Sequence, residues 1–411
     1  MPLTHTWLGH ESDERIGLIR ARCYADTPAD FPSFVERTVY DRFSPGDVLV
    51  MSDATGDVAT ATSLSLTMNL RGRRVACQGV AWVGTGKSHR RRKLDGNGIA
   101  SHVMHALLKK ARERGDVVSM LSPFRASFYE RFGYGLTERQ HVWTIPLQLL
   151  PRVDTSGFVE ITPDNQNAHF DAALHSREQQ FHNTHGDIHT NADSLRFWLR
   201  DLQRKGSRFV DVQADGIASQ FTLDTEYENG QAVGVVHHPW WVDDVALVRM
   251  LAMLGTLSDQ YSFVRVTLPT SLRVNHLLRE TQLPHRRVDH ATATCSLITR
   301  MQLRVLDHEK FLSALTLPAH TKGATTITIQ EVEGLATTLS VVVDAGRIIA
   351  APSTRAAEVS MSDKTWASLA MGELLADDAA RCGLLTINEP RAMDVLRLFN
   401  TGPTPYCHEY F

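Results

Sequence analysis

Three arginines and two glycines stand close together in residues 89–98, whose sequence is His-Arg-Arg-Arg-Lys-Leu-Asp-Gly-Asn-Gly. Arginine pairs with phosphate through forked hydrogen bonds, and glycine lets backbone N–H groups approach a ligand. A helix is predicted from Ile99, and the N–H groups at a helix N-terminus bind pyrophosphate well. The segment therefore predicts a site for a phosphate-rich ligand, although a solvated basic loop would have the same composition. A Rossmann loop is not favoured, because no clean G-x-G-x-x-G follows a strand.

The strand that precedes this segment, residues 80–85, is flanked by glycines. A strand that ends in Gly84 can bulge and diverge from its neighbour. Backbone groups freed in this way could pair with a ligand that carries an amide-bearing arm. A plain core strand is the alternative interpretation.

Tyr129 begins a short predicted helix in Ser-Phe-Tyr-Glu-Arg-Phe-Gly-Tyr, residues 127–134. A phenol facing a thiolate gives up its proton at a cost of ~2 kcal/mol, because the two ordinary pKa values are near 10 and 8.5. We therefore expect hydrogen-bond donation to a leaving thiolate rather than full proton transfer. The alternatives are a tyrosine that only packs, and donation by Tyr134 or water instead.

Regular elements are predicted around these segments. Apolar residues recur every fourth position over residues 98–114, which predicts a helix that ends at Gly115. Strands are predicted at residues 48–51, 58–68 and 117–121. A strand, a helix and a strand in so short a span indicate parallel neighbours and an α/β layer.

The chain has 411 residues, which is too long for one ordinary core. We expect three sections: 1–150 with the ligand site, 151–292, which again mixes predicted strands and helices, and 293–411. In the second section the helix predicted at 244–256 follows Asp243 and Asp244, which would repel phosphate. No phosphate-rich ligand is expected there.

The composition narrows the functional classes. The net charge is −3, which argues against a dedicated nucleic-acid binder. No apolar segment suits a signal or a membrane span, so a cytoplasmic protein without membrane contact is expected. His182, His185 and His189 match no zinc pattern and are expected in a polar loop, so no metal is predicted.

Together these motifs resemble the GCN5-related N-acetyltransferases, and among them the enhanced intracellular survival (Eis) family. The resemblance rests on Gly-Val-Ala-Trp-Val at residues 79–83, Ser-His-Arg-Arg-Arg at 88–92, the Gly-led helix, Leu-Ser-Pro-Phe at 121–124, and Phe-Tyr-Glu-Arg-Phe-Gly-Tyr at 128–134. It implies an α/β (α+β) chain of two tandem acetyltransferase-like domains followed by a sterol-carrier-like domain with a catalytic C-terminus. It also implies a homohexamer.

The resemblance implies roles for individual residues. Tyr129 falls on the family's general acid, and Phe411 on the terminal residue whose carboxylate serves as base. The positions implied for acetyl-CoA are Val83, Gly84, Thr85, Arg91, Arg92, Gly96, Gly98, Ile99, Ala100, Ser101, Phe124 and Arg125. Five residues, 93–97, look like an insertion, which leaves the phosphate-loop register open between Gly96 and Gly98. Glu409 stands one position earlier than the family's usual acidic residue.

The expected activity is acetyl transfer from acetyl-CoA to a primary amine, on an aminoglycoside, a lysine side chain or a peptide, by direct attack in a ternary complex. The alternative is a degenerate relative that binds coenzyme A, or a lipid through the sterol-carrier-like domain.

Overall fold

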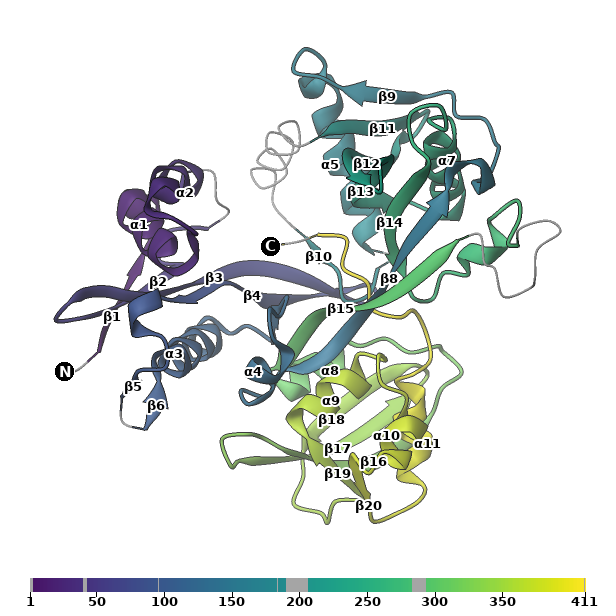
Figure 1. Ribbon diagram of the computed structural model, residues 1–411. Helices are drawn as coiled ribbons and strands as arrows, with labels where there is room; N and C mark the ends of the chain where they lie inside the picture. The colour runs from purple at the N-terminus through teal and green to yellow at the C-terminus, as the bar shows by residue number, and fades with distance from the viewer. Residues whose placement is uncertain are drawn as a thin grey trace. The chain divides into compact units, whose positions relative to one another are not determined.

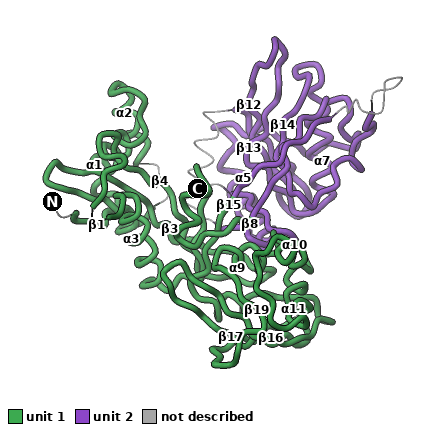
Figure 2. The backbone as a smooth tube through the Cα atoms, turned by 60° about the horizontal axis from the view of Figure 1, so that its bottom comes forward, with its two compact units in different colours: residues 1–137, 301–402, 411 green, residues 138–300, 403–410 purple. Residues whose placement is uncertain are grey.

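The computed structural model describes residues 3–39, 43–94, 96–182, 184–189, 206–282, 293–409 and 411. They form two compact units (Figure 2). Unit 1 comprises Met1–Thr137, Met301–Gly402 and Phe411, and unit 2 comprises Glu138–Arg300 and Pro403–Tyr410. The first and third predicted sections thus share most of one unit. The boundaries at residues 150 and 292 stay predictions.

The N-terminal part of unit 1 is a twisted sheet with helices on both faces (Figure 1). Its strands follow the order β1-β2-β3-β4-β7-β15, and the pairs are antiparallel except for β4 with β7. The bounds are β1 Thr4–Leu8, α1 Asp13–Tyr24, α2 Phe31–Thr38, β2 Val48–Asp53, β3 Gly56–Leu70, β4 Arg73–Thr85, β5 Lys93–Leu94, β6 Asn97–Gly98, α3 Ile99–Arg114, β7 Val118–Leu121, α4 Ala126–Glu130 and β15 Thr294–Val305. Of β15, the residues from Met301 onward belong to unit 1.

Strand β2 begins with four consecutive apolar residues, Val48–Met51, because both of its faces are covered. Val48 and Val50 pack with Ile16 and Ile19 of α1 in one core cluster. Their neighbours Leu49 and Met51 pack with α3 in another cluster. Because successive side chains of a strand point to opposite faces, a strand covered on both faces needs apolar residues at every position.

Helix α3 confirms the predicted periodicity. Ile99, Val103, Leu107 and Ala111 are all buried, and the helix spans Ile99–Arg114. Gly115 ends it in the left-handed region at φ 81°, where its N–H donates to the carbonyls of the last turn.

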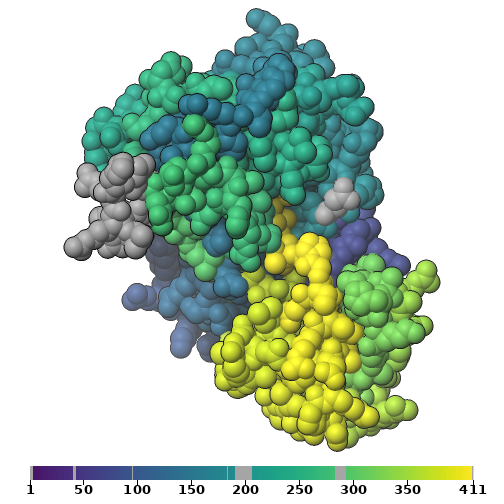
Figure 3. All heavy atoms as spheres, turned by 90° about the vertical axis from the view of Figure 1, so that its right-hand side faces the viewer, coloured from purple at the N-terminus to yellow at the C-terminus, as the bar shows by residue number. Residues whose placement is uncertain are grey.

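The C-terminal part of unit 1 has its own five-stranded sheet in the order β18-β17-β16-β19-β20. The bounds are α8 His308–Ala314, β16 Gly323–Gln330, β17 Ala336–Asp344, β18 Arg347–Pro352, β19 Val359–Ser362, α9 Asp363–Ala370, α10 Ala376–Arg381, β20 Leu385–Ile387 and α11 Ala392–Leu398. Trp366 of α9 is fully buried, whereas α10 and α11 expose polar side chains among the yellow atoms of Figure 3. The sterol-carrier likeness of this part stays a prediction.

One predicted helix is too long. The sequence predicts a helix over residues 366–375, but α9 ends at Ala370. Gly372 has a φ of +82°, and such a residue in the left-handed region ends a helix.

Unit 2 repeats the N-terminal part of unit 1, with strand order β8-β14-β13-β12-β11-β9. Helix α7 connects β13 to β14, which pair in parallel, as α3 connects β4 to β7. The bounds are β8 Gly135–Pro146, β9 Phe158–Ile161, α5 Gln166–His182, β10 Ile188–His189, β11 Ser207–Gln213, β12 Gly216–Glu228, β13 Gln231–Trp241, α7 Asp244–Gly255 and β14 Phe263–Pro269. Within the described ranges, no helix has the length and apolarity needed to cross a membrane.

Candidate active site

Strands β4 and β7 diverge after a short stretch of pairing. They pair in parallel only over Cys77–Gly79 and Val118–Met120. Strand β4 continues to Thr85, and its residues from Ala81 onward are partly exposed. Among the described strands, none pairs with this edge of β4 beyond Gly79. Its backbone groups are therefore available to a ligand with amide groups.

The predicted bulge is present in β4, slightly earlier than Gly84. Thr62 of β3 faces Ala81 and Thr60 faces Gly84, so two residues of β4 oppose one residue of β3. Trp82, one of the two, has a φ of +53°. A bulky residue in the left-handed region is strained, and such strain often accompanies a functional site.

Gly84 is required by a close approach of α1. A Cβ atom at Gly84 would lie 2.8 Å from Cβ of Cys23 and 2.9 Å from Cε2 of Tyr24. The Tyr24 ring also meets the Trp82 ring edge to face, with centroids 5.4 Å apart. Sequence reasoning missed Tyr24, which belongs to no recognisable pattern, and it included Trp82 only as part of the motif at residues 79–83, without a role of its own.

The apparent insertion before α3 is a hairpin. Lys93 pairs with Gly98 and Leu94 pairs with Asn97, which forms β5 and β6. Gly96 lies in the turn at φ 79°, whereas Gly98 is the N-cap of α3 in an extended conformation at φ −72°. No side chain caps this helix. The N-terminal N–H groups of α3 thus follow Gly98, and the geometry favours Gly98 over Gly96 as the glycine nearest to a bound phosphate.

The three arginines have different surroundings. Arg90 donates to the carbonyl of Cys23 over 3.1 Å, and Arg92 donates to Asp53 over 2.7 Å. Hydrogen bonds from Thr55, together with the charge of Arg92, lower the pKa of Asp53. Arg91 is exposed at φ +66° and has no ion-pair partner among the described residues. It is the arginine most available to an anion from solution.

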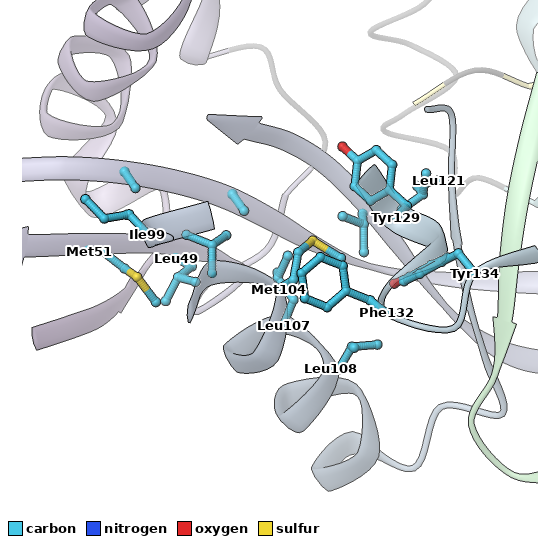
Figure 4. Close-up of a cluster of buried hydrophobic side chains, with 14 of the residues drawn as sticks. Leu49, Met51, Ile99, Met104, Leu107, Leu108, Leu121, Tyr129, Phe132 and Tyr134 are labelled. Atoms are coloured by element: carbon cyan, nitrogen blue, oxygen red, sulfur yellow. The ribbon is translucent and has the colours of Figure 1, made fainter. Parts of the chain in front are cut away.

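Tyr129 lies near the end of the one-turn helix α4, which begins at Ala126 rather than at Tyr129 as predicted, and it is 4% exposed. Its ring packs edge to face on Phe124 and Phe128, with centroids 5.7 Å and 4.9 Å away. Figure 4 shows its hydroxyl pointing away from the buried side chains of Met104 and Leu107. Burial raises the pKa of Tyr129 above its ordinary value, so the phenol keeps its proton at neutral pH and remains a hydrogen-bond donor.

Tyr134 is already engaged elsewhere. It is fully buried, and its hydroxyl lies 2.6 Å from Oγ of Ser119, which in turn donates to Gln78 over 2.8 Å. A hydroxyl committed to this buried network is a poorer candidate for the donor than Tyr129.

The remaining predicted positions cluster around these elements. Arg125 precedes α4 in an extended conformation, and Phe124 is 74% exposed beside Tyr129. Phe411 packs against the buried cluster that includes Ile16 and Ile19 of α1. All predicted site residues therefore belong to unit 1, although their roles stay predictions.

The three histidines lie in unit 2 but do not share the predicted polar loop, because His182 is the last residue of α5 and His189 lies in β10. His185 is buried, and its carbonyl accepts from the N–H of Tyr406 over 2.9 Å. His189 forms an ion pair with Glu178. Within the described ranges, no three His, Cys, Asp or Glu side chains are placed to hold a metal ion.

The helix of unit 2 that corresponds to α3 has a different N-terminus. Asp243 caps α7, and its carboxylate accepts from the N–H of Ala246 over 2.8 Å. This side chain brings negative charge to the place where the N-terminus of α3 is uncapped.

Comparison with known proteins agrees with this geometry. Residues 11–137 match a family model described as an acetyltransferase (GNAT) domain. No curated protein matches the sequence.

Several solved structures have the same fold over the whole chain. A GCN5-related N-acetyltransferase from Anabaena variabilis ATCC 29413 is 17% identical, with a TM-score of 0.81 and full coverage of both chains. A GCN5-related N-acetyltransferase from Kribbella flavida is 19% identical, with a TM-score of 0.76, and covers 100% of this chain and 98% of its own. Eis1 from Mycobacterium abscessus is 18% identical, with a TM-score of 0.78 and full coverage of both. Residues 11–137 therefore carry the acetyltransferase (GNAT) domain that the sequence motifs predict, within a chain that shares the fold of these structures.

Proposed function

We propose that the protein is an acetyl-CoA-dependent N-acetyltransferase of the Eis type, which acetylates primary amines such as those of aminoglycosides or lysine side chains. The observation that carries the proposal is the divergence of β4 from β7 beside the uncapped N-terminus of α3. The open edge of β4 suits the amides of pantetheine, and the helix N-terminus suits a pyrophosphate. Arg91 and Arg92 supply positive charge beside that terminus.

Tyr129 acts on the leaving group in this proposal. The amine nitrogen attacks the thioester carbonyl, a C–N bond forms, and the C–S bond breaks to release the thiolate of coenzyme A. The buried phenol of Tyr129 donates a hydrogen bond to the sulfur as charge develops on it. Because burial raises its pKa, Tyr129 is not expected to serve as the base.

The amine must lose a proton before or during attack. We propose, from the family resemblance, that the main-chain carboxylate of Phe411 holds the ammonium group and passes its proton to water. A carboxylate is too weak a base to remove the proton alone, since the difference in pKa from an alkylammonium is large. Desolvation of the ammonium beside the carboxylate lowers that barrier.

The experiment is to measure release of the coenzyme A thiol with a panel of amines: an aminoglycoside, a polyamine and a lysine peptide. Tyr129→Phe removes only the hydroxyl and should lower kcat by ~10²–10⁴, with little change in the KM for acetyl-CoA. Phe128→Leu on the same helix is the matched control for packing. Stabilisation by acetyl-CoA without turnover of any amine would instead favour a binding protein.

The homohexamer is a further proposal, which sedimentation of the purified protein tests.

A further inference from the structure

We propose that Arg304 is a positioning residue for Tyr129, and that the C-terminal part of unit 1 thereby sets the geometry of the acetyl-transfer site. The inference rests on the proposed role of Tyr129. Arg304 lies in β15, about 170 residues after α4 in the chain, and is 1% exposed. No sequence pattern connects it with the site.

Two successive hydrogen bonds link Arg304 to Tyr129, the first from the side chain of Arg304 and the second between backbone groups. Nη1 of Arg304 donates to the carbonyl of Phe132 over 2.7 Å, and the N–H of Phe132 donates to the carbonyl of Tyr129 over 2.8 Å. A second side chain of β15 also donates to this part of the chain: Nε2 of Gln302 donates to the carbonyl of Ala126 over 3.4 Å. The first residue of α4 and the turn that follows its last residue are thus both bonded to β15.

The charge of Arg304 is balanced by the turn between β16 and β17. Its Nη2 lies 3.5 Å from Glu331 and also pairs with Glu333. Hydrogen bonding from His308, with a smaller contribution from Arg304, lowers the pKa of Glu331 to about 2. Both carboxylates therefore stay ionised at neutral pH. A buried guanidinium fixed by two carboxylates has little freedom, so the carbonyl of Phe132 is held in one place.

The same turn also contacts the proposed cofactor helix. Nη2 of Arg112, near the end of α3, lies 3.7 Å from Glu333 and 4.0 Å from Glu331. The acidic turn therefore contacts both β15, through Arg304, and α3, which begins at the proposed phosphate site.

The first residues of helix α9 lie directly against the turn that follows α4. Gly133 has a φ of +80°, and a Cβ atom on it would lie 2.4 Å from Oδ2 of Asp363. A Cβ atom on Gly135 would lie 2.0 Å from the carbonyl oxygen of Lys364. The side chain of Lys364 pairs with Glu130 of α4 over 3.0 Å. Gly135 is needed because the C-terminal part approaches the backbone here, and Gly133 is needed both for this approach and for its positive φ.

This support matters because α4 is a single turn of five residues. A helix so short is not stable by itself in water. The phenol oxygen has to stay within hydrogen-bond reach of the sulfur, and a displacement of ~1 Å costs on the order of 10²-fold in rate. Arg304 therefore contributes to kcat by fixing the position of the Tyr129 hydroxyl, without contacting the substrate itself.

The test is a double-mutant cycle between Arg304→Met and Tyr129→Phe in the full-length protein. We expect Arg304→Met to lower kcat by about 10- to 100-fold, while the KM for acetyl-CoA changes less than about twofold. In the Tyr129→Phe background the same change should lower kcat by less than about threefold, because the hydrogen bond whose geometry Arg304 controls is already absent. Arg304→Lys keeps one donor for the carbonyl of Phe132 and should recover part of kcat.

Arg249→Met is the matched control. Arg249 of unit 2 also binds a carboxylate, Asp211, and backbone carbonyls, those of Asp154 and Ser156. It should lower Tm as Arg304→Met does, but leave kcat unchanged. If Arg304→Met does not fold, Glu333→Gln and Lys364→Ala, which loosen the same support at more exposed positions, take its place in the cycle.

Two results would overturn the proposal. One is an unchanged kcat in all the variants of the support. The other is an equal loss of kcat with and without the hydroxyl of Tyr129, which would make Arg304 a general stabiliser. Failure of the proposed function looks different, because Tyr129→Phe alone would then leave kcat unchanged or no amine would be acetylated.

Discussion

The ring of Phe411 lies against Gly79, the last residue of β4 that pairs with β7. A Cβ atom on Gly79 would stand 3.0 Å from Cε2 of Phe411 and 2.5 Å from Cδ1 of Leu66. Gly79 pairs with Met120 of β7, and beyond it the two strands separate. The absence of a side chain at residue 79 therefore makes room for the Phe411 ring at the point where the proposed cofactor cleft begins.

Gly79→Ala should displace this ring. The added methyl group can push the end of Leu66 aside, but the aromatic ring has less freedom to move, so we expect kcat to fall at least tenfold. Overpacking of this kind costs ~1–3 kcal/mol in stability, which a thermal melt will show. Gly234→Ala in unit 2, where a Cβ atom would stand 3.0 Å from Leu223, is the matched control and should leave kcat unchanged. Equal kcat in both variants would show that the ring has no part in the reaction.

Substitution of the two glycines before α3 separates their roles. Gly98 has a negative φ, and among the described residues no atom lies within 4 Å of the place where its Cβ atom would stand, so Gly98→Ala should not change Tm. It should raise the KM for acetyl-CoA several-fold, because the methyl group stands where a phosphate would approach. Gly96→Ala should instead lower stability by ~1 kcal/mol, since its φ of +79° is unfavourable for alanine. The reverse pattern would place the phosphate at the hairpin.

Charge reversal at Arg91 tests the electrostatic part of the same site. Arg91→Glu should raise the KM for acetyl-CoA at least tenfold, and high salt should diminish the difference from wild type. Lys109→Glu makes the same change of charge on the exposed face of α3, where the side chain is 78% exposed, and is the control. Similar KM values for the two variants would mean that Arg91 does not meet the cofactor.

Glu138 predicts a pH dependence of stability. Burial raises the pKa of Glu138 to about 8, against an ordinary 4.5, although the N–H of Cys407 donates to it over 3.0 Å. Between these pH values the folded protein holds a proton that the unfolded chain releases. The favourable contribution of this group is therefore complete below about pH 4.5 and is lost as the pH rises toward 8.

The substitution Glu138→Gln removes that titration. Its carbonyl oxygen can still accept from Cys407, so Tm should exceed that of wild type at pH 8, and the difference should shrink toward pH 5. Glu160→Gln, at an exposed position of β9, should follow wild type at each pH. A wild-type Tm that rises from pH 5 to pH 8 relative to Glu138→Gln would contradict the sign of this prediction.

The sequence predicted best where local pattern and fold agree. The apolar periodicity of α3 predicted both its bounds and its buried face, because the helix lies on a sheet and exposes its other side. The bulge in β4 was predicted from Gly84, yet Gly84 is needed for the approach of α1, and the strained residue is Trp82. A glycine in the sequence can indicate that another segment packs closely against the backbone, but it does not identify that segment.

The contacts between distant segments could not be predicted. Arg304 lies far from Tyr129 in the chain and reaches it only through the backbone of Phe132. Residues 93–97 suggested an insertion into a loop, whereas the pairing of β5 with β6 places most of them in a hairpin before the N-terminus of α3. Such relations depend on which elements pack together, and no single segment contains that information.

A short extension after Phe411 tests the proposed catalytic carboxylate. The tail that leads to it is firmly bound within unit 2: the ring of His408 lies 3.0 Å from Asp187, and Arg177 donates to Glu409 over 3.2 Å. A Gly-Ser extension should therefore keep these contacts and leave Tm unchanged, while it replaces the carboxylate at residue 411 by a neutral amide. If this carboxylate holds the substrate ammonium, kcat should fall at least tenfold, and the same residues added at the N-terminus should have no effect.

Phe411→Ala keeps a carboxylate but removes the ring from Gly79, so it reports the contribution of the ring alone. Full activity of the extended protein would leave the proton to water or to another side chain.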